Sequence, residues 1–364
     1  MKVIFAGGGT GGHINPAISI ADYAKSRDKS FEALFIGTKS GLETKLVPKA
    51  GYDIEYIEIE GFDRKHLLKN VSVMKKLIKA RRECVRIIKE FNPDCVICTG
   101  GYISGPVAMA AKRLKKPSLI HEQNVYPGLT VKGSQKYVDY VAVSFEETVN
   151  HMQAKDKCVV TGNPIRPEIL MSDTVEAKKK LNKEKRPFVL VFGGSLGADR
   201  INEAVVDILP KISEENKIDI LFGTGERNYE KISGKLDSVK LNSNIEVTPY
   251  IHNMADCMAA ADLVVCRSGA ITVSELACLG KPAVLIPSPN VVRNHQEQNA
   301  REFETNGAAE LILEKDLTPD VLYNKIMNTV KDAGTLASMS NNMKKLAKAD
   351  ALEIIYNLMK KMSK

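Results

Sequence analysis

The chain opens with residues 1–20, Met-Lys-Val-Ile-Phe-Ala-Gly-Gly-Gly-Thr-Gly-Gly-His-Ile-Asn-Pro-Ala-Ile-Ser-Ile. Residues 3–5 form a short apolar run bounded by glycine, which is typical of a buried parallel strand. Asn15 and Pro16 indicate the start of a helix, because proline is favoured at the first helical position. A turn made almost wholly of glycine lies between them. Glycine has no Cβ, so another molecule can approach this backbone closely, and the helix N-terminus favours an anion or a sugar.

His13 lies in this turn and carries an imidazole, the side chain best suited to move a proton near neutral pH. Five of the six residues 7–12 are glycine, which is more conformational freedom than a tight turn needs. We therefore interpret the turn as a ligand-binding loop and His13 as a candidate catalytic residue. The alternative is that His13 only caps the helix. The spacing fits the dinucleotide pattern Gly-x-Gly-x-x-Gly weakly.

Length and composition point to a two-domain protein. The chain has 364 residues, 44% of them hydrophobic, which is too long for one ordinary core. It contains no apolar run of about 18 residues, which argues against a membrane span. The first residues read as a core strand rather than a signal sequence, so we expect a cytoplasmic protein. Cys95 and Cys98 have C-x-x-C spacing, but three residues apart on a strand they point to opposite faces, so both are interpreted as structural.

Positive charge is concentrated in one stretch. The net charge is +8, and residues 62–91 hold ten Lys or Arg against three acids. Apolar residues three or four apart predict one or two amphipathic helices there. Such helices lie on an anionic membrane surface or form the solvated outside of an α/β domain, and the pattern does not choose between these. Nucleic acid is disfavoured, because the stretch lacks interleaved aromatic residues and a recognised binding module.

Strand and helix patterns alternate along the first half, which predicts a parallel sheet with helical crossovers. Residues 95–106 repeat the order of strand, glycine turn and helix. His121, Glu122 and Asn124 gather at the carboxyl end of the next strand, where open α/β sheets bind ligands. For His121 and Glu122, hydrogen bonds that only lock the sheet edge are the alternative. Two prolines in residues 163–167 mark the end of the first domain.

The second half follows the same plan. Residues 188–198 repeat the apolar strand, glycine turn and helix, with Ser195 placed to donate to a phosphate. Residues 261–287 predict a strand, a polar glycine loop, a helix over about 270–279 and another strand. Glu275 can accept hydrogen bonds from a ribose, or it serves only the helix dipole. The amide-rich residues 294–300 suit a sugar, and residues 341–364 predict a final helix.

With these motifs in hand, the chain resembles glycosyltransferases of the MurG type, which have the GT-B fold and make lipid II of bacterial peptidoglycan. The resemblance covers essentially the whole chain and rests on six motifs in order, which occupy residues 8–13, 121–124, 161–166, 193–197, 266–275 and 295–296. It implies an α/β protein with two Rossmann-like domains whose parallel sheets face each other across a cleft. The domains expected are residues 1–163 and 164–340, followed by a helix in 341–364 that packs back on the first domain.

The resemblance also implies the substrates and the residues that hold them. The donor is UDP-N-acetylglucosamine, and the acceptor is undecaprenyl-pyrophosphoryl-N-acetylmuramoyl-pentapeptide (lipid I) at the cytoplasmic face of the cell membrane. Carried over by motif, the donor-binding residues are Ser195, Ala270, Ile271 and Thr272 for pyrophosphate and sugar, the Ile251 backbone for uracil, Glu275 for ribose and Gln296 for the sugar hydroxyls. Thr10, Gly11, Gly12 and Asn124 are expected to reach the donor from the first domain, and Arg166 to lie near it.

Inverting transfer to the C4 hydroxyl needs a base for that hydroxyl and stabilisation for the departing UDP. His13 is our hypothesis for the base, with Glu122 in reserve. The sequence contains no Asp-x-Asp, so neither a metal nor a cofactor is expected, and helix N-termini with Ser195 would stabilise the diphosphate. A membrane-bound acceptor shifts the interpretation of residues 62–91 toward membrane contact, through Leu67, Leu68, Met74 and Ile78 with the basic residues.

Three other functions stay open at this point. A nicotinamide oxidoreductase uses the same order of strand, glycine and helix, but no acid ends the strand over residues 31–36. A related transferase could use another membrane lipid, such as diacylglycerol, as acceptor. A membrane-surface binding protein without catalysis is the third, and it would consume no sugar nucleotide.

Overall fold

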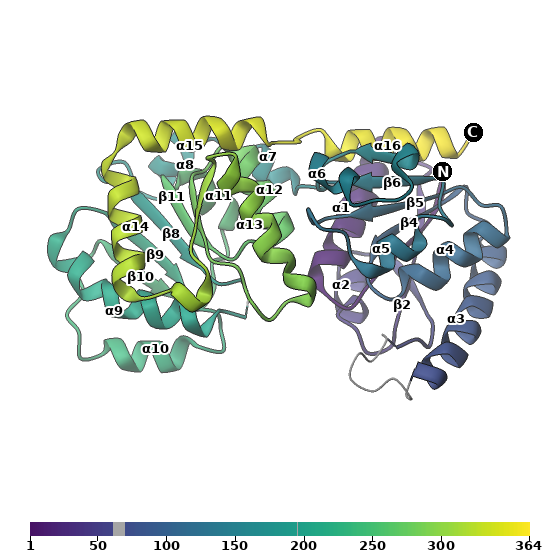
Figure 1. Cartoon of the computed structure of the whole chain (residues 1–364), viewed down its shortest axis with the longest axis horizontal. Helices are drawn as coiled ribbons and strands as arrows, with labels where there is room; N and C mark the ends of the chain where they lie inside the picture. Colours follow the sequence, from purple (N-terminus) through teal and green to yellow (C-terminus); the bar gives the residue numbers. More distant parts are fainter. Residues whose placement is uncertain (61–69, 195) are drawn as a thin grey trace. The chain divides into compact units, whose positions relative to one another are not determined.

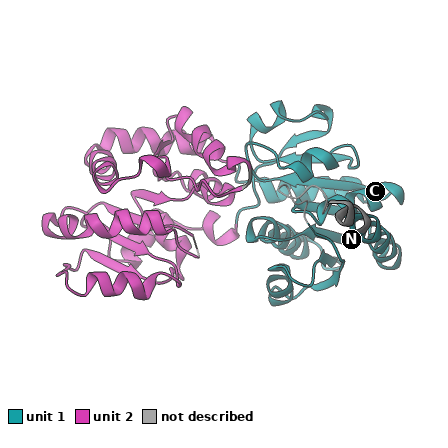
Figure 2. Ribbon diagram, turned by 60° about the horizontal axis from the view of Figure 1, so that its bottom comes forward, with its two compact units in different colours: residues 1–165, 348–364 teal, residues 166–347 magenta. Residues whose placement is uncertain are grey.

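A computed structural model describes residues 1–60, 70–194 and 196–364, with the side chains of 70–75 and 292 left aside. The chain divides into two compact units (Figures 1 and 2). Unit 1 comprises Met1–Ile165 and Lys348–Lys364, and unit 2 comprises Arg166–Ala347. Each unit is a parallel sheet covered by helices, so the predicted α/β class with two Rossmann-like sheets is confirmed.

The sheet of unit 1 has seven strands in the order β3-β2-β1-β4-β5-β6-β7, and all neighbours pair in parallel. The strands are β1 (Lys2–Gly7), β2 (Glu32–Gly37), β3 (Asp53–Tyr56), β4 (Cys95–Gly100), β5 (Ser118–Glu122), β6 (Tyr140–Val143) and β7 (Cys158–Val160). The strand order reverses direction between β1 and β4. In open α/β sheets, ligands bind at the carboxyl ends of the strands beside such a switch point.

Helices cover both faces of this sheet, as its buried central strands β4 and β5 require. They are α1 (Gly11–Arg27), α2 (Glu43–Lys49), α3 (Asn70–Phe91), α4 (Ser104–Arg113), α5 (Leu129–Ser134), α6 (Glu146–Asn150), the short η2 (Lys155–Lys157) and α16 (Ala351–Met362). Cys95 packs in the core on one face of the sheet and Cys98 in the core on the other. Burial raises the pKa of both thiols to about 12, which confirms a structural role.

Unit 2 repeats the plan with six parallel strands in the order β10-β9-β8-β11-β12-β13. The strands are β8 (Phe188–Phe192), β9 (Asp219–Gly223), β10 (Ile245–Thr248), β11 (Leu263–Cys266), β12 (Ala283–Leu285) and β13 (Ala309–Leu311). The helices are α7 (Pro167–Leu170), α8 (Thr174–Lys180), α9 (Asp199–Glu215), α10 (Tyr229–Leu236), α11 (Met254–Ala260), α12 (Ala270–Leu279), η3 (Val292–Asn294), α13 (His295–Thr305), η4 (Glu314–Asp316), α14 (Pro319–Lys331) and α15 (Ala333–Lys345). The switch point of this sheet lies between β8 and β11.

The end of the chain differs from the single helix expected over 341–364. Two helices occupy this region, and α15 belongs to unit 2 while α16 belongs to unit 1. Asp350 precedes the first turn of α16, and residues 346–350 separate the two helices. Leu352, Ile355 and Met359 follow a helical spacing and are buried in the same core as residues of α1. The C-terminal helix therefore completes one face of unit 1.

Candidate active site

The glycine turn of unit 1 is shorter than the sequence predicted. Helix α1 begins at Gly11 after the extended N-cap Thr10, so Pro16 lies inside the helix and not at its first position. His13 is therefore in the first turn of α1 and not in the loop before it. Glycine is a poor helix former in general, but the first turn needs no amide partners, so α1 starts there without losing hydrogen bonds.

The imidazole of His13 is fixed by the loop that precedes it. Its Nδ1 lies 3.1 Å from the Gly8 carbonyl oxygen and 3.3 Å from Thr10 Oγ1. A carbonyl can only accept, so Nδ1 carries the proton and Nε2 keeps a lone pair. Burial lowers the pKa of His13, although the bond to Gly8 opposes this shift. The ring is neutral at pH 7 and is able to take a proton through Nε2.

A second glycine turn, after β4, braces the first. Gly100 and Gly101 have φ of +106° and +75°, which favour glycine. A Cβ on Gly100 would lie 2.7 Å from Cδ2 of His13, and one on Gly101 would lie 2.4 Å from the Gly8 oxygen. Thr99 Oγ1 also donates to the His13 carbonyl at 2.7 Å. The sequence showed this turn as a repeat of the first, but gave no sign that the two interlock at the switch point.

The polar residues after β5 build a rigid loop. Glu122 is buried and accepts from the Asn124 backbone (2.9 Å), from Asn124 Nδ2 (3.0 Å) and from the Gly128 backbone (2.7 Å). Burial raises the pKa of Glu122, and these hydrogen bonds oppose the rise. His121 is buried, with Nε2 3.0 Å from the Gly162 oxygen, and burial lowers its pKa to about 4. The Glu122 side chain therefore holds the loop that carries Asn124, whereas His121 joins the end of β5 to the loop at Gly162.

In unit 2, the predicted helix over 270–279 is found with the same bounds as α12. Gly269 is its N-cap and Gly280 ends it with φ +64°, in the left-handed conformation common at helix ends. Ala270, Ile271 and Thr272 form its first turn, at the end of the helix where the dipole is positive. This N-terminus lies at the carboxyl end of β11, beside the switch point of the sheet.

Arg166 and Glu275, expected to lie near the donor, contact each other. Arg166 Nε donates to Glu275 Oε1 at 2.9 Å, and the Glu275 side chain is only 6% exposed. Burial raises the pKa of Glu275, and the Arg166 charge opposes the rise. The pair joins the first residue of unit 2 to the middle of α12. It sets the direction of a carboxylate that can accept from a hydroxyl.

Gln296 is hydrogen-bonded to the loop that precedes α12. Ser268 Oγ donates to the Gln296 carbonyl oxygen at 2.8 Å, and Gln296 Oε1 accepts from the Ser288 backbone at 2.8 Å. Ile251 follows β10 and is buried. Its side chain lies close to Gly223, where a Cβ would be 2.8 Å from Ile251 Cδ1. Ser195 lies outside the described residues.

Comparison with known proteins gives the family. Models of the glycosyltransferase family 28 N-terminal and C-terminal domains match residues 3–143 and 188–355. A UDP-N-acetylglucosamine–N-acetylmuramyl-(pentapeptide) pyrophosphoryl-undecaprenol N-acetylglucosamine transferase of Acetivibrio thermocellus is 48% identical over 365 residues, covering 100% of this chain and 99% of the relative. The chain belongs to glycosyltransferase family 28, and within it to the MurG type.

Other relatives agree with the family assignment. A transferase of the same name from Thermoanaerobacter pseudethanolicus is 45% identical and covers 99% of each chain. The crystal structure of MurG from Acinetobacter baumannii matches with a TM-score of 0.81 at 29% identity, again over 99% of each chain. The glycosyltransferase prediction is confirmed, and the nicotinamide oxidoreductase is not favoured.

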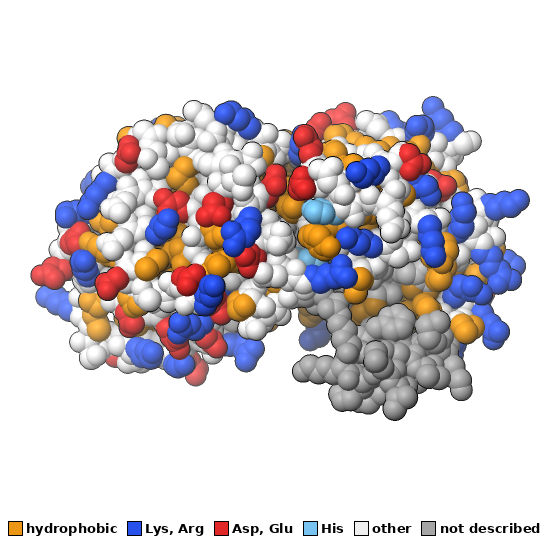
Figure 3. Space-filling model, in the orientation of Figure 1, with side chains coloured by type: hydrophobic (Ala, Val, Ile, Leu, Met, Phe, Trp, Pro, Cys, Tyr) orange, Lys and Arg blue, Asp and Glu red, His pale blue; other side chains and the backbone are white. Residues whose placement is uncertain are grey.

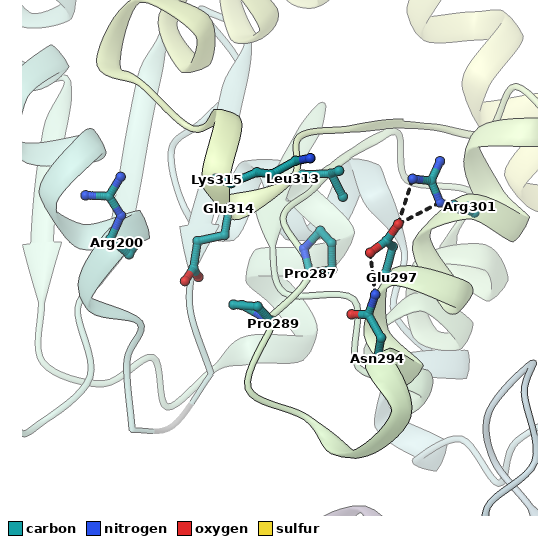
Figure 4. Close-up of a pocket in the computed structure, with 9 residues that line it drawn as sticks. All are labelled: Arg200, Pro287, Pro289, Asn294, Glu297, Arg301, Leu313, Glu314 and Lys315. Carbon is teal, nitrogen blue, oxygen red and sulfur yellow. Dashed lines mark hydrogen bonds and ion pairs between the residues drawn. The ribbon is translucent and has the colours of Figure 1, made fainter.

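Residues in and near the amide-rich cluster of this family 28 chain make different contacts. Asn294, Glu297 and Arg301 line a cavity of about 600 Å³ (Figure 4). The Gln296 carbonyl oxygen instead accepts from Ser268 Oγ. Glu297 accepts from both Asn294 and Arg301, so its carboxylate is already occupied. The sequence did not indicate this cavity, whose lining also includes Arg200, Pro287, Pro289, Leu313, Glu314 and Lys315.

A second cavity lies in unit 1 and is mainly apolar. It has a volume of about 290 Å³, and its lining includes Leu77, Tyr102, Pro106, Met109, Leu129 and Tyr137. Tyr102 also borders the glycine loop, because a Cβ on Gly9 would lie 3.5 Å from its ring. Leu129, at the start of α5, is 50% exposed and lines the cavity. The apolar cavity and the His13 site are thus neighbours.

The described residues cover only part of the membrane patch expected from the sequence. Leu67 and Leu68 of the expected membrane patch lie outside the described residues, as does the side chain of Met74, and Ile78 is 46% exposed on α3. The described residues hold no group of three or more His, Cys, Asp or Glu side chains that could bind a metal ion.

Proposed function

We propose that this protein transfers N-acetylglucosamine, with inversion, from UDP-N-acetylglucosamine to the C4 hydroxyl of N-acetylmuramyl-(pentapeptide) pyrophosphoryl-undecaprenol, giving lipid II. The observation that carries the proposal is the full-length likeness to transferases with this name. In the reaction the C4 oxygen bonds to the anomeric carbon and the bond from that carbon to the diphosphate oxygen breaks. The hydroxyl proton passes to the base, and UDP departs with the bonding electrons.

His13 is proposed as the base. Its neutral ring has a lone pair on Nε2, and the Gly8 carbonyl stabilises the imidazolium that forms when the proton arrives. Glu122, the reserve candidate, is a weaker choice because three hydrogen bonds commit its two oxygens to the Asn124 loop. Thr10, Gly11, Gly12 and Asn124 are proposed to contact the sugar nucleotide beside this base.

The donor is proposed to bind unit 2 beside the β8/β11 switch point. The N-terminus of α12, with residues 270–272 in its first turn, is proposed to face the diphosphate, because the helix dipole favours an anion at this end. Glu275, held by Arg166, is proposed to accept from the ribose hydroxyls, and Gln296 to contact the sugar. Ser195 and the Ile251 backbone complete the set, for phosphate and for uracil.

The acceptor is proposed to approach unit 1 from the cytoplasmic face of the membrane, where the protein binds as a peripheral protein. Lys and Arg side chains gather over α3 and α4 (Figure 3), and Arg82, Lys112 and Arg113 are exposed there. The apolar cavity beside Tyr102 adds a surface that a lipid can contact. Among the described helices, none has the length and apolar character to cross a bilayer.

One assay tests the activity. Radiolabelled UDP-N-acetylglucosamine is incubated with a short-chain muramoyl-pyrophosphoryl lipid, and the label is followed into the lipid fraction. We expect transfer to this acceptor and none to diacylglycerol. Label in diacylglycerol, or no label in either lipid, would contradict the proposal.

A vesicle assay tests the membrane contact separately. We expect the protein to float with vesicles containing anionic phosphatidylglycerol and not with pure phosphatidylcholine. The triple variant R82E/K112E/R113E should lose this binding while keeping transfer to a water-soluble acceptor. Equal flotation of the triple variant and the wild-type protein would contradict the assignment of this surface.

A further inference from the structure

A carboxylate that the sequence did not single out lies beside the glycine loop of unit 1. Glu43 is the first residue of α2, and its side chain is completely buried. Oε1 accepts from the Thr38 backbone N–H (3.0 Å) and from Thr38 Oγ1 (2.8 Å), and Oε2 accepts from the Gly9 backbone N–H (3.0 Å). Among the described Lys and Arg side chains, none forms an ion pair with Glu43.

The glycines around Glu43 have no space for a Cβ atom. A Cβ on Gly41 would lie 2.0 Å from Oε2, one on Gly37 2.7 Å from Cγ, and one on Gly8 2.9 Å from Oε1. Burial opposes ionisation of the carboxyl, but the hydrogen bonds from Gly9 and Thr38 prevail and lower the pKa of Glu43. Glu43 is thus a buried anion whose site is formed by backbone and hydroxyl donors.

One peptide group connects this anion to His13. The N–H of Gly9 donates to Glu43, and the C=O of the same peptide group, which belongs to Gly8, accepts from His13 Nδ1 at 3.1 Å. The peptide plane is therefore held at both ends. An anion on the N–H polarises the peptide and strengthens its carbonyl as an acceptor, because hydrogen bonds in a chain reinforce one another.

We propose that Glu43 is a positioning residue for His13, acting through the peptide group that joins Gly8 and Gly9. It fixes the carbonyl that selects the Nδ1–H tautomer, and it stabilises the imidazolium that forms when Nε2 takes a proton. The arrangement has the logic of a carboxylate that orients a catalytic histidine, with a peptide group inserted between the two side chains. This inference rests on the proposed role of His13 as the base.

Two variants of Glu43 and one control variant test whether this residue acts on His13. E43Q keeps the size of the side chain but removes the charge. Its amide NH₂ would also face one of the groups that now donate to Glu43, the Gly9 N–H or those of Thr38. We expect kcat to fall about tenfold, as for partners that orient a functional histidine, with KM for UDP-N-acetylglucosamine unchanged. E43D should restore part of kcat. T38V removes one hydroxyl donor to Glu43 but leaves the Gly9 link, so its kcat should stay within about twofold of the wild type.

The pH profile separates positioning from a loss of structure. Besides Glu43 and His13, the titratable side chain of Tyr102 lies near this peptide, because its ring borders Gly9. Loss of the negative charge in E43Q disfavours the imidazolium, so the acid limb of kcat/KM should move to lower pH, whereas T38V should leave it in place. A folded E43Q protein with wild-type kcat and an unmoved acid limb would overturn the proposal.

NMR spectroscopy tests the connection between Glu43 and His13 without an activity assay. In full-length protein labelled with ¹⁵N-histidine, His13 should show the Nδ1–H tautomer in the wild type and a mixed tautomer in E43Q. If E43Q does not fold, the wild-type Gly9 amide decides, because its proton should be protected from exchange and should shift as His13 titrates. An unprotected Gly9 amide would overturn the proposal. A wild-type chain with this signature but without transfer would instead contradict the proposed function alone.

Discussion

The glycine corners after β1 and after β8 have similar sequences, but different neighbouring loops brace them. In unit 1, the loop after β4 supports the corner across the switch point, and Glu43 approaches from the β2 side. In unit 2, a Cβ on Gly197 would lie 2.2 Å from the Thr224 oxygen, so the support comes from the loop after β9, on the side away from β11. The first corner therefore holds His13, the proposed base, whereas the second leaves its switch point beside the N-terminus of α12.

This difference shows that a strand, a glycine turn and a helix do not by themselves define a phosphate site. In unit 1, the Gly9 N–H already donates to a carboxylate, and a buried negative charge beside the loop would repel a diphosphate. In unit 2, the buried acid Glu275 is paired with Arg166. We therefore expect the sign and pairing of the nearby charge to decide which corner binds the donor.

The largest expected effect is a loss of kcat on substitution of His13 in the first corner, with donor binding in unit 2 unchanged. H13A should lower kcat by about a hundredfold to ten-thousandfold, the range for loss of a general base. Binding of UDP-N-acetylglucosamine, measured by calorimetry, should change little because the proposed donor contacts of unit 2 remain. H151A serves as the matched control in unit 1 and should keep full activity. Wild-type turnover by H13A at saturating substrates would mean that His13 is not the base.

A smaller effect is expected from the donor side. E275Q should weaken UDP-N-acetylglucosamine binding by about tenfold to a hundredfold, since charged hydrogen bonds contribute about 1.5–3 kcal/mol. Its kcat should fall less than that of H13A. The nearby E168Q serves as a control, because Glu168 lies on α7 and is exposed. Unchanged donor affinity in E275Q would indicate that the carboxylate serves only the ion pair with Arg166.

Much of this organisation could be predicted from local sequence, because strands, turns and glycine-bounded helices depend on neighbouring residues. Helix α12 was predicted with its observed bounds because Gly269 and Gly280 mark both ends. Helix α1 was predicted to start too late, because its first turn contains residues that disfavour helices elsewhere. Local pattern thus fails where the chain departs from average propensity.

The contacts that give the corners different chemistry could not be predicted in this way. Glu43 is one acid in a polar stretch, and only the return of the chain after β2 buries it against Gly9, 34 residues away. Arg166 and Glu275 are 109 residues apart. The strands around the two corners are arranged in the same order, but the bracing loop follows β4 in unit 1 and β9 in unit 2, so strand order alone does not predict the brace.

Glycine substitutions test the two braces directly. G101A and G197A should each destabilise the chain by about 2–5 kcal/mol, the sum of the cost of a left-handed backbone and of overpacking. Thermal unfolding measures this, with G105A and G234A as controls, since a Cβ there meets nothing within 4 Å. G101A should also lower kcat, because it displaces the Gly8 carbonyl, while G197A should mainly affect donor binding. Equal kinetic effects of both variants would remove the distinction between the corners.

Acidification should loosen unit 1 through His121, which is buried as the neutral ring. Its pKa is about 4 in the folded chain against an ordinary value near 6.5, so the unfolded chain binds a proton first. The stability that His121 provides is therefore intact above pH 6.5 and is lost as the pH falls toward 4, by about 2 kcal/mol at pH 5.

H121Q is the matched variant for this effect, because glutamine can still donate to the Gly162 oxygen but does not titrate. Its unfolding free energy should change less than that of the wild type between pH 7 and 5, whereas H151Q should follow the wild type. Hydrogen exchange should place the wild-type loss in β5, β6 and the loop at Gly162, since the imidazole joins these segments. If the unfolding free energies of H121Q and the wild type fell in parallel, other groups would cause the acid sensitivity. His121 would then have no part in the pH response of unit 1.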